Sequence, residues 1–109
     1  MLDYDFVFRK GILFIRLKGD ADKKADNFFA NEIDPLILDN GIENVVLNVS
    51  KLNRVDYDGM LAIYNSYLRL SKKSNVFLCE IPSYLKDKFK CLFDNINEKE
   101  DELTILMKN

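Results

Sequence analysis

The chain has 109 residues, of which 48% are hydrophobic and 31% are charged, and its formal net charge at pH 7 is -2. This balance is typical of a single soluble globular domain and excludes an intrinsically disordered chain. The chain also lacks the overall positive charge that is usual for nucleic-acid-binding proteins, so we expect no nucleic-acid partner.

The amino-terminal segment carries acids, Asp3 and Asp5, where a signal peptide would need basic residues. No uninterrupted apolar run approaches the roughly 18 residues of a membrane span. We therefore expect a cytoplasmic protein without direct membrane insertion.

The first predicted elements are two strands, Phe6–Arg9 and Ile12–Leu17. The short separation, with Lys10 and Gly11 as the turn, predicts that they form a hairpin. We expect the stretch Gly19–Asp22 to break the second strand.

The next segment is predicted to be a helix that begins near Lys23, with Asp22 as its cap. Pro35 removes one backbone donor and should kink or interrupt this helix before Leu36. Gly41 is predicted to end it. The spacing of its apolar residues gives the helix one buried face: Ala25, Phe28, Phe29, Ile33, Leu36 and Ile37.

The middle of the chain alternates between strand and helix. Val45–Val49 is β-branched and almost wholly apolar, which predicts a central strand covered on both faces. Met60–Lys72 has the apolar spacing of a helix, and Val76–Cys79 is predicted to be another buried strand.

The last part of the chain is predicted to hold a helix that starts at Pro82 and Ser83, and a final strand, Leu103–Met107. The acidic stretch Glu98–Glu102 between them is predicted to be a solvated loop. The element order is then ββαβαβαβ. It predicts a single α/β domain over residues 1–109, with helices packed on a mostly parallel or mixed β-sheet.

The chain offers little for catalysis or metal binding. It contains no histidine, which excludes Ser–His and Cys–His nucleophilic chemistry, and it has no glycine-rich phosphate-binding motif. Cys79 and Cys91 lie among apolar neighbours, which predicts free, buried thiols rather than metal ligands. We therefore expect no catalytic residues, no metal and no other cofactor.

The most informative stretch runs from Val45 to Leu61, where a buried strand leads through a short loop into a helix. Asp56 is placed to cap this helix by accepting a hydrogen bond from an amide two or three residues later. Asp58 then lies in the first turn, where the helix dipole favours a negative charge. The missing side chain of Gly59 lets another group approach closely.

Asp56 and Asp58 also have simpler interpretations. Helix starts favour aspartate for capping alone, without any function. A pair of carboxylates that binds Mg²⁺ is a further alternative, which we rank below a binding role because no phosphate-binding loop accompanies it.

Three stretches occur in the order and at the spacing of one known family: Ile12–Asp22, Ile42–Val49 and Val55–Met60. They resemble the STAS domain, and specifically the bacterial anti-sigma-factor antagonists. The first resembles that family's second strand with its G-x-x-D exit, and the second its central strand. The third resembles its hydrophobic-Asp-Ser-Ser/Thr-Gly-Leu motif.

The resemblance implies a role in transcription regulation. In this family the domain binds an anti-sigma factor, which is often also a kinase, and thereby frees a sigma factor. The kinase phosphorylates a serine or threonine at the helix start, and the added charge of roughly -1.5 to -2 breaks the complex. The implied partner is an anti-sigma factor or a kinase-like regulator.

One departure from the family motif concerns the phosphorylated position. Asp22, Asp56 and Gly59 match the family's aspartates and glycine, but the phosphorylated hydroxyl falls on Asp58 and the hydroxyl before it on Tyr57. We expect no phosphorylation there by a serine kinase. Either Asp58 mimics the phosphorylated state and holds the domain in a weak-binding form, or the partner accepts an acid and the switch is lost.

The predicted partner surface combines the loop with the residue after the second strand: Asp22, Arg54, Asp56, Tyr57, Asp58 and Gly59. The alternative function is a STAS-type scaffold or assembly subunit of a stress-signalling complex or a membrane transporter. Self-association as a homodimer would favour that alternative.

Overall fold

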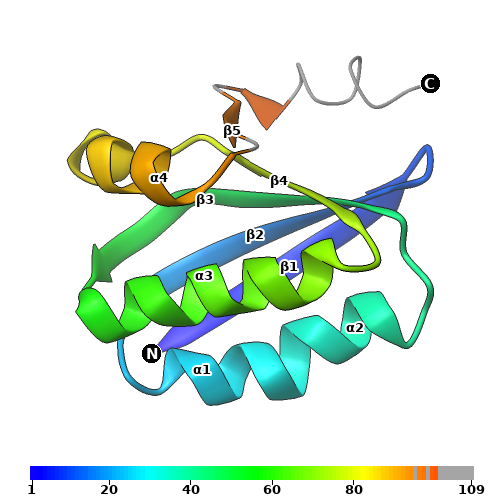
Figure 1. Ribbon diagram of the computed structural model, residues 1–109, viewed down its shortest axis with the longest axis horizontal. Helices are drawn as coiled ribbons and strands as arrows, with labels where there is room; N and C mark the ends of the chain where they lie inside the picture. The colour runs from blue at the N-terminus through cyan, green and yellow to red at the C-terminus, as the bar shows by residue number, and fades with distance from the viewer. Residues whose placement is uncertain (95, 98, 101–109) are drawn as a thin grey trace.

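The computed structural model describes residues 1–94, 96–97 and 99–100, and shows a five-stranded sheet with helices packed against it (Figure 1). The strands are β1 (Leu2–Arg9), β2 (Ile12–Ala21), β3 (Asn44–Val55), β4 (Asn75–Cys79) and β5 (Ile96–Asn97). The helices are α1 (Ala25–Phe28), α2 (Asp34–Leu38), α3 (Tyr57–Ser71) and α4 (Lys86–Leu92). A π-helical stretch, Phe29–Ile33, joins α1 to α2, and a 3-10 turn, Ser83–Leu85, precedes α4.

The strands lie side by side in chain order, β1-β2-β3-β4-β5. β1 is antiparallel to β2, and the other neighbouring strands are parallel. The predicted α/β class, mixed sheet and order ββαβαβαβ are therefore confirmed. The predicted last strand, Leu103–Met107, lies outside the described residues, and β5 takes the last place in the order.

The main core lies between the sheet and the helices. Alternate residues of the central strands face it, as the period of two in a strand requires: Leu13, Ile15, Leu17, Val45, Leu47 and Val49. A smaller buried cluster lies on the opposite face: Ile12, Phe14, Val46 and Cys79. The stretch Val45–Val49 is thus buried on both faces, as its apolar run predicts. In the described part of the chain, no helix is long and apolar enough to cross a membrane.

The predicted hairpin between the first two strands is confirmed. Arg9 pairs with Ile12, and the two residues between them, Lys10 (φ 53°) and Gly11 (φ 78°), are both left-handed. This is the pattern of a type I′ turn, whose twist suits the flanking strands. β1 begins earlier than predicted, because the alternation of apolar and acidic residues continues back to Leu2.

The prediction that Gly19–Asp22 breaks the second strand is wrong, because β2 pairs with β3 as far as Ala21. Register shifts accommodate the irregularity, one of them beside Gly19. Gly19 has a φ of 103°, and a Cβ at this position would lie 2.2 Å from the backbone oxygen of Met1. Glycine therefore permits the close approach of Met1. Strands β2 and β3 end beside each other, since Ala21 pairs with Val55.

The predicted interruption by Pro35 takes the form of the π-helical stretch that ends just before it. Pro35 itself lies in the first turn of α2, where a missing N–H costs least. The prediction that Asp22 caps the helix is wrong, because α1 begins at Ala25 and its N-cap is Lys24, which makes no side-chain capping hydrogen bond. Asp22 instead closes the turn that precedes the helix. Its Oδ1 accepts a hydrogen bond from the N–H of Lys24 at 2.9 Å, and its carbonyl oxygen accepts one from Ala25 at 2.9 Å.

The two cysteines differ in exposure. Cys79 is buried on β4, and this burial raises the pKa of its thiol to about 12. Cys91 is exposed on α4, so the prediction of two buried thiols is wrong for this residue. Apolar neighbours in sequence do not show which side of a short helix faces the core, so they do not predict the exposure of Cys91.

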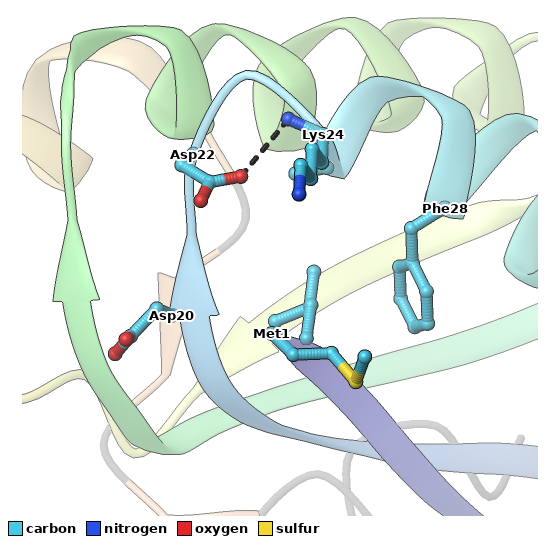
Figure 2. Close-up of a pocket in the computed structure, with 7 residues that line it drawn as sticks. Met1, Asp20, Asp22, Lys24 and Phe28 are labelled. Carbon is cyan, nitrogen blue, oxygen red and sulfur yellow. Dashed lines mark hydrogen bonds between the residues drawn. The ribbon is translucent and has the colours of Figure 1, made fainter.

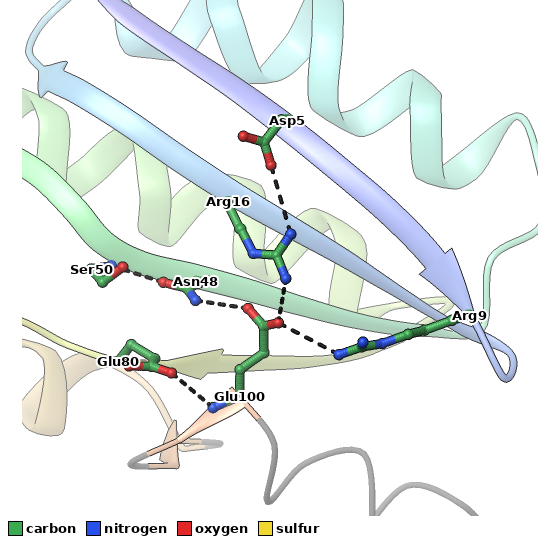
Figure 3. Close-up of polar contacts among 7 residues, drawn as sticks. All are labelled: Asp5, Arg9, Arg16, Asn48, Ser50, Glu80 and Glu100. Atoms are coloured by element: carbon green, nitrogen blue, oxygen red, sulfur yellow. Dashed lines mark hydrogen bonds and ion pairs between the residues drawn. The ribbon is translucent and has the colours of Figure 1, made fainter.

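The prediction that Glu98–Glu102 is a solvated loop is wrong at Glu100, which is 6% exposed. Its carboxylate accepts hydrogen bonds from Arg16 Nη2 at 2.6 Å and Asn48 Nδ2 at 2.7 Å (Figure 3). Its backbone N–H donates to the carboxylate of Glu80 at 3.2 Å. The hydrogen bond to Glu100 raises the pKa of the Arg16 guanidinium, so the buried carboxylate has a charged partner.

We predict that Glu100→Ala lowers the free energy of unfolding by about 1–3 kcal/mol, because the buried amide of Asn48 loses its acceptor. Arg16 is 37% exposed and regains water, which limits the loss. Asp5→Ala is the control: it removes an exposed carboxylate 3.9 Å from Arg16 and 3.3 Å from Lys18, and the loss of these surface ion pairs should cost less than about 1 kcal/mol. Urea unfolding measures both variants, and equal losses would contradict the prediction.

Candidate functional site

The ends of two parallel strands form the frame of the site. Ala21, the last residue of β2, pairs with Val55, the last residue of β3. Asp22 and Asp56 follow directly, so the strand register places two predicted site residues beside each other. The N–H of Asp56 donates a hydrogen bond to the carbonyl oxygen of Ala21 at 3.1 Å, which ties the loop to β2.

Helix α3 starts as predicted. Asp56 is its N-cap, with extended backbone (φ -87°, ψ -176°), and its Oδ1 accepts a hydrogen bond from the N–H of Gly59 at 2.8 Å. Asp58 lies in the first turn and is exposed, and there the helix dipole favours its negative charge. Tyr57 is 76% exposed, so the cap presents an aromatic and an acidic side chain to the surroundings.

The close approach predicted at Gly59 is made by the protein itself. Gly59 is buried, and a Cβ at this position would lie 2.0 Å from the carbonyl oxygen of Ala21 and 2.9 Å from its Cβ. The expectation that this position leaves room for a partner is therefore corrected, because Ala21 occupies that room. Gly59 sets the distance between α3 and the end of β2.

The charged side chains at this edge are mostly acidic. A hollow of about 260 Å³ opens between the strand ends and is lined by Asp20, Ala21, Asp22, Arg54 and Asp56. Arg54 is exposed, and no ion pair joins it to any residue that the structure describes. The hollow therefore presents one basic side chain among three acids.

A second hollow, of about 240 Å³, shares Asp20 and Asp22 with the first (Figure 2). Met1 and Phe28 form its apolar side, while the carboxylate of Asp22 turns back to the N–H of Lys24. Asp20 was not among the predicted site residues, because β2 was expected to end before it.

A larger groove of about 500 Å³ lies between the start of α3 and α4. Tyr57 and Met60 line its α3 side, while Lys88, Cys91 and Leu92 belong to its α4 side. None of these α4 residues was among the predicted site residues. Only the packing of α4 beside α3 brings these distant residues next to the loop.

The structure thus places the predicted site residues at three locations. Asp22, Arg54 and Asp56 surround one hollow, Tyr57 lines the neighbouring groove, and Asp58 is exposed on the first turn of α3. Among the residues described, no group of three or more His, Cys, Asp or Glu side chains is arranged to hold a metal ion. Exposed, unpaired charges on a fixed frame suit contact with another macromolecule.

Comparison with known protein families shows to which family this domain belongs. A family model for the STAS domain matches residues 3–101. The chain belongs to the STAS domain family. The resemblance seen in the sequence motifs is therefore confirmed.

Solved structures of STAS-type proteins share this fold. The phosphorylated form of the Bacillus cell fate determinant SpoIIAA aligns with a TM-score of 0.72 and 16% identity, covering 98% of this chain and 100% of that one. A putative anti-sigma factor antagonist from Thermotoga maritima aligns with a TM-score of 0.80 and 12% identity, covering 97% and 95%. An anti-sigma factor antagonist from Mycobacterium paratuberculosis aligns with a TM-score of 0.74 and 12% identity, covering 100% and 96%.

We predict that Gly59→Ala lowers the free energy of unfolding of this STAS domain by about 3 kcal/mol or more, because the added Cβ overpacks against the backbone of Ala21. Asp58→Ala, one residue away and exposed, is the control. It loses a favourable interaction with the helix dipole and should cost about 0.3–1 kcal/mol. Thermal and urea unfolding compare the two, and a Gly59→Ala protein as stable as the wild type would refute the packing argument.

Proposed function

We propose that this STAS domain is a regulatory module that binds an anti-sigma factor or a kinase-like regulator, and so acts on transcription by freeing a sigma factor. Its contact region, the loop surface, consists of Asp22, Arg54, Asp56, Tyr57 and Asp58. The observation that carries the proposal is that Tyr57, Arg54 and Asp58 are exposed on a loop fixed to β2 and α3. The charged side chains of Arg54 and Asp58 make no ion pair with any residue that the structure describes.

The fixed backbone supports a binding role. One hydrogen bond joins Asp56 to Ala21, and another joins the Asp56 side chain to the N–H of Gly59. A surface held in this way loses little conformational entropy when a partner binds, so more of the contact energy appears as affinity.

The side chains on the loop surface are also of the types that dominate protein interfaces. Tyrosine and arginine are enriched among the residues that carry most of the binding energy, and both Tyr57 and Arg54 are exposed here. The groove beside Tyr57 has an apolar lining that includes Met60 and Leu92, which suits an apolar side chain of the partner.

Asp58 determines how such a complex is regulated. By resemblance it stands where the family has a phosphorylatable hydroxyl, and the SpoIIAA relative has a phosphorylated form. A carboxylate offers no hydroxyl to a serine kinase, and its single charge is smaller than the roughly -1.5 to -2 of a phosphate. We infer that the complex is not broken by phosphorylation at this position.

The surrounding charges favour a partner that accepts the acid. Asp58 follows Asp56 by two residues, and Asp56 lines the hollow together with Asp20 and Asp22. A partner that faces these acids needs basic side chains of its own, and Asp58 adds to that attraction. Asp58 on this account strengthens the complex instead of mimicking a released state.

To test this proposal, the protein retained by the wild-type domain from a native cell extract is identified, purified and titrated against variants by calorimetry. We predict that Arg54→Glu weakens binding about tenfold or more, because it reverses the one exposed positive charge among the residues that line the hollow. Lys72→Glu makes a similar charge change at the other end of α3 and should leave the affinity unchanged. Asp58→Ser should weaken binding, since a basic partner loses one acidic contact.

The outcomes separate the alternatives. Equal affinities for Arg54→Glu and Lys72→Glu place the contact region elsewhere. Tighter binding by Asp58→Ser identifies Asp58 as a phosphate mimic that weakens the complex. Retention of a scaffold or transporter component, with no anti-sigma factor or kinase-like protein, replaces the antagonist function with the assembly function.

A further inference from the structure

Strand β1 forms one open edge of the sheet. It is the first strand in the order β1-β2-β3-β4-β5, and β2 is its one partner strand among the residues described. The pairing with β2 runs from Leu2 to Arg9 without a register shift. Natural edge strands are usually protected by a proline, a bulge, a short length or charged side chains. β1 has no proline, bulge or short length over its 8 residues, and its charged side chains are Asp3, Asp5 and Arg9.

The outer backbone groups of β1 face away from β2, and one of them, the N–H of Tyr4, is bonded to the side chain of its own neighbour, a bond that an added strand would replace. Arg9 closes the two-residue turn as a hydrogen-bonded pair with β2, so bonded positions alternate from there along the strand. The residues in between, Tyr4, Phe6 and Phe8, direct their N–H and C=O groups away from β2. In agreement with this, the N–H of Tyr4 donates to the side chain of Asp3 at 2.7 Å.

All three residues are aromatic: Tyr4 is half-buried against the main core, and the other two rings are exposed. Phe6 is 50% exposed and Phe8 is 54% exposed, on the face of the sheet that holds the main core. Tyr4 stacks against Phe6 with ring centroids 6.3 Å apart. Exposed aromatic side chains beside free backbone groups favour the addition of another strand, because both are buried at once.

The sequence of β1 is complementary to itself in the antiparallel direction. When Phe6 lies opposite Phe6 of a second copy, Tyr4 lies opposite Phe8 of that copy. Asp3 then lies opposite Arg9 of the second copy, and opposite charges in such cross-strand positions attract. Asp3 is exposed, and the side chain of Arg9 is 45% exposed although it also lies 3.7 Å from the carboxylate of Glu100, so a second copy can reach both charges.

Other registers fit less well. Centring the pair on Asp5 places two Asp5 carboxylates opposite each other, which is destabilising. Centring it on Val7 also places Asp5 opposite Arg9, but it shortens the paired stretch within β1 to residues 5–9, compared with residues 3–9 for the register centred on Phe6. The register centred on Phe6 combines the longer ladder with matched charges.

We propose that β1 pairs antiparallel with β1 of a second copy of this chain, centred on Phe6, to form a symmetric dimer with one continuous sheet. The loop surface lies beyond the ends of β2 and β3, and β2 separates β3 from β1, so both copies keep it accessible. The dimer does not depend on the proposed partner and is tested without it. Because pairing through β1 leaves the loop surface free, this dimer is compatible with the proposed antagonist function as well as with the assembly alternative.

The full-length chain is examined by size-exclusion chromatography with light scattering over a concentration series. We expect a dimer for the wild type, and a dimer dissociation constant raised about tenfold or more by Phe6→Lys with Phe8→Lys, because lysine protects a strand edge. Leu68→Lys, at a residue of α3 that is 44% exposed, is the matched control and should leave the dimer intact. Circular dichroism verifies that each variant is folded.

Disulfide cross-linking tests the register. In a Cys91→Ser background, Phe6→Cys should form a disulfide-linked dimer under mild oxidation, since opposite residues of a hydrogen-bonded pair lie about 5.5 Å apart. Val7→Cys should not cross-link. The proposal is overturned by a monomeric wild type at every concentration, by a lysine variant that dimerises like the wild type, or by cross-linking through Val7→Cys in place of Phe6→Cys.

Discussion

The contact between the backbone of Ala21 and Gly59 fixes where α3 lies, and the rest of the loop surface depends on it. A Cβ at Gly59 would lie 2.0 Å from the carbonyl oxygen of Ala21, so α3 reaches this position only with glycine there. The same carbonyl accepts a hydrogen bond from Asp56, whose side chain caps α3. One strand end therefore holds both the loop and the helix that follows it.

The fold is largely predictable from local patterns, whereas contacts between distant segments are not. The apolar run Val45–Val49 predicts a strand buried on both faces, and capping chemistry predicts the role of Asp56, because each depends on neighbouring residues alone. Glu100 lies in an acidic stretch that resembles a solvated loop, yet a strand distant in sequence supplies Arg16 as its partner. The neighbour of Gly59 likewise comes from β2, which no local pattern reveals.

The STAS fold places Asp58 at the start of α3, and we propose that it puts a fixed charge where other members of the family carry a phosphorylatable hydroxyl. A permanent carboxylate at a helix start is stabilised by the dipole and needs no kinase to maintain it. Regulation of such a domain then rests on its supply or on its assembly, and the open edge of β1 offers a route to assembly that leaves the loop surface free.

The central claim is that the complex of this domain with its regulator is insensitive to phosphorylation at position 58. The most direct measurement adds ATP to the purified complex with a kinase-like partner, followed by size-exclusion chromatography and intact-mass determination. The account predicts an unchanged mass and a persisting complex for the wild type, and one added phosphate with release for Asp58→Ser. A phosphate on the wild-type chain, or its release by ATP, would contradict the account.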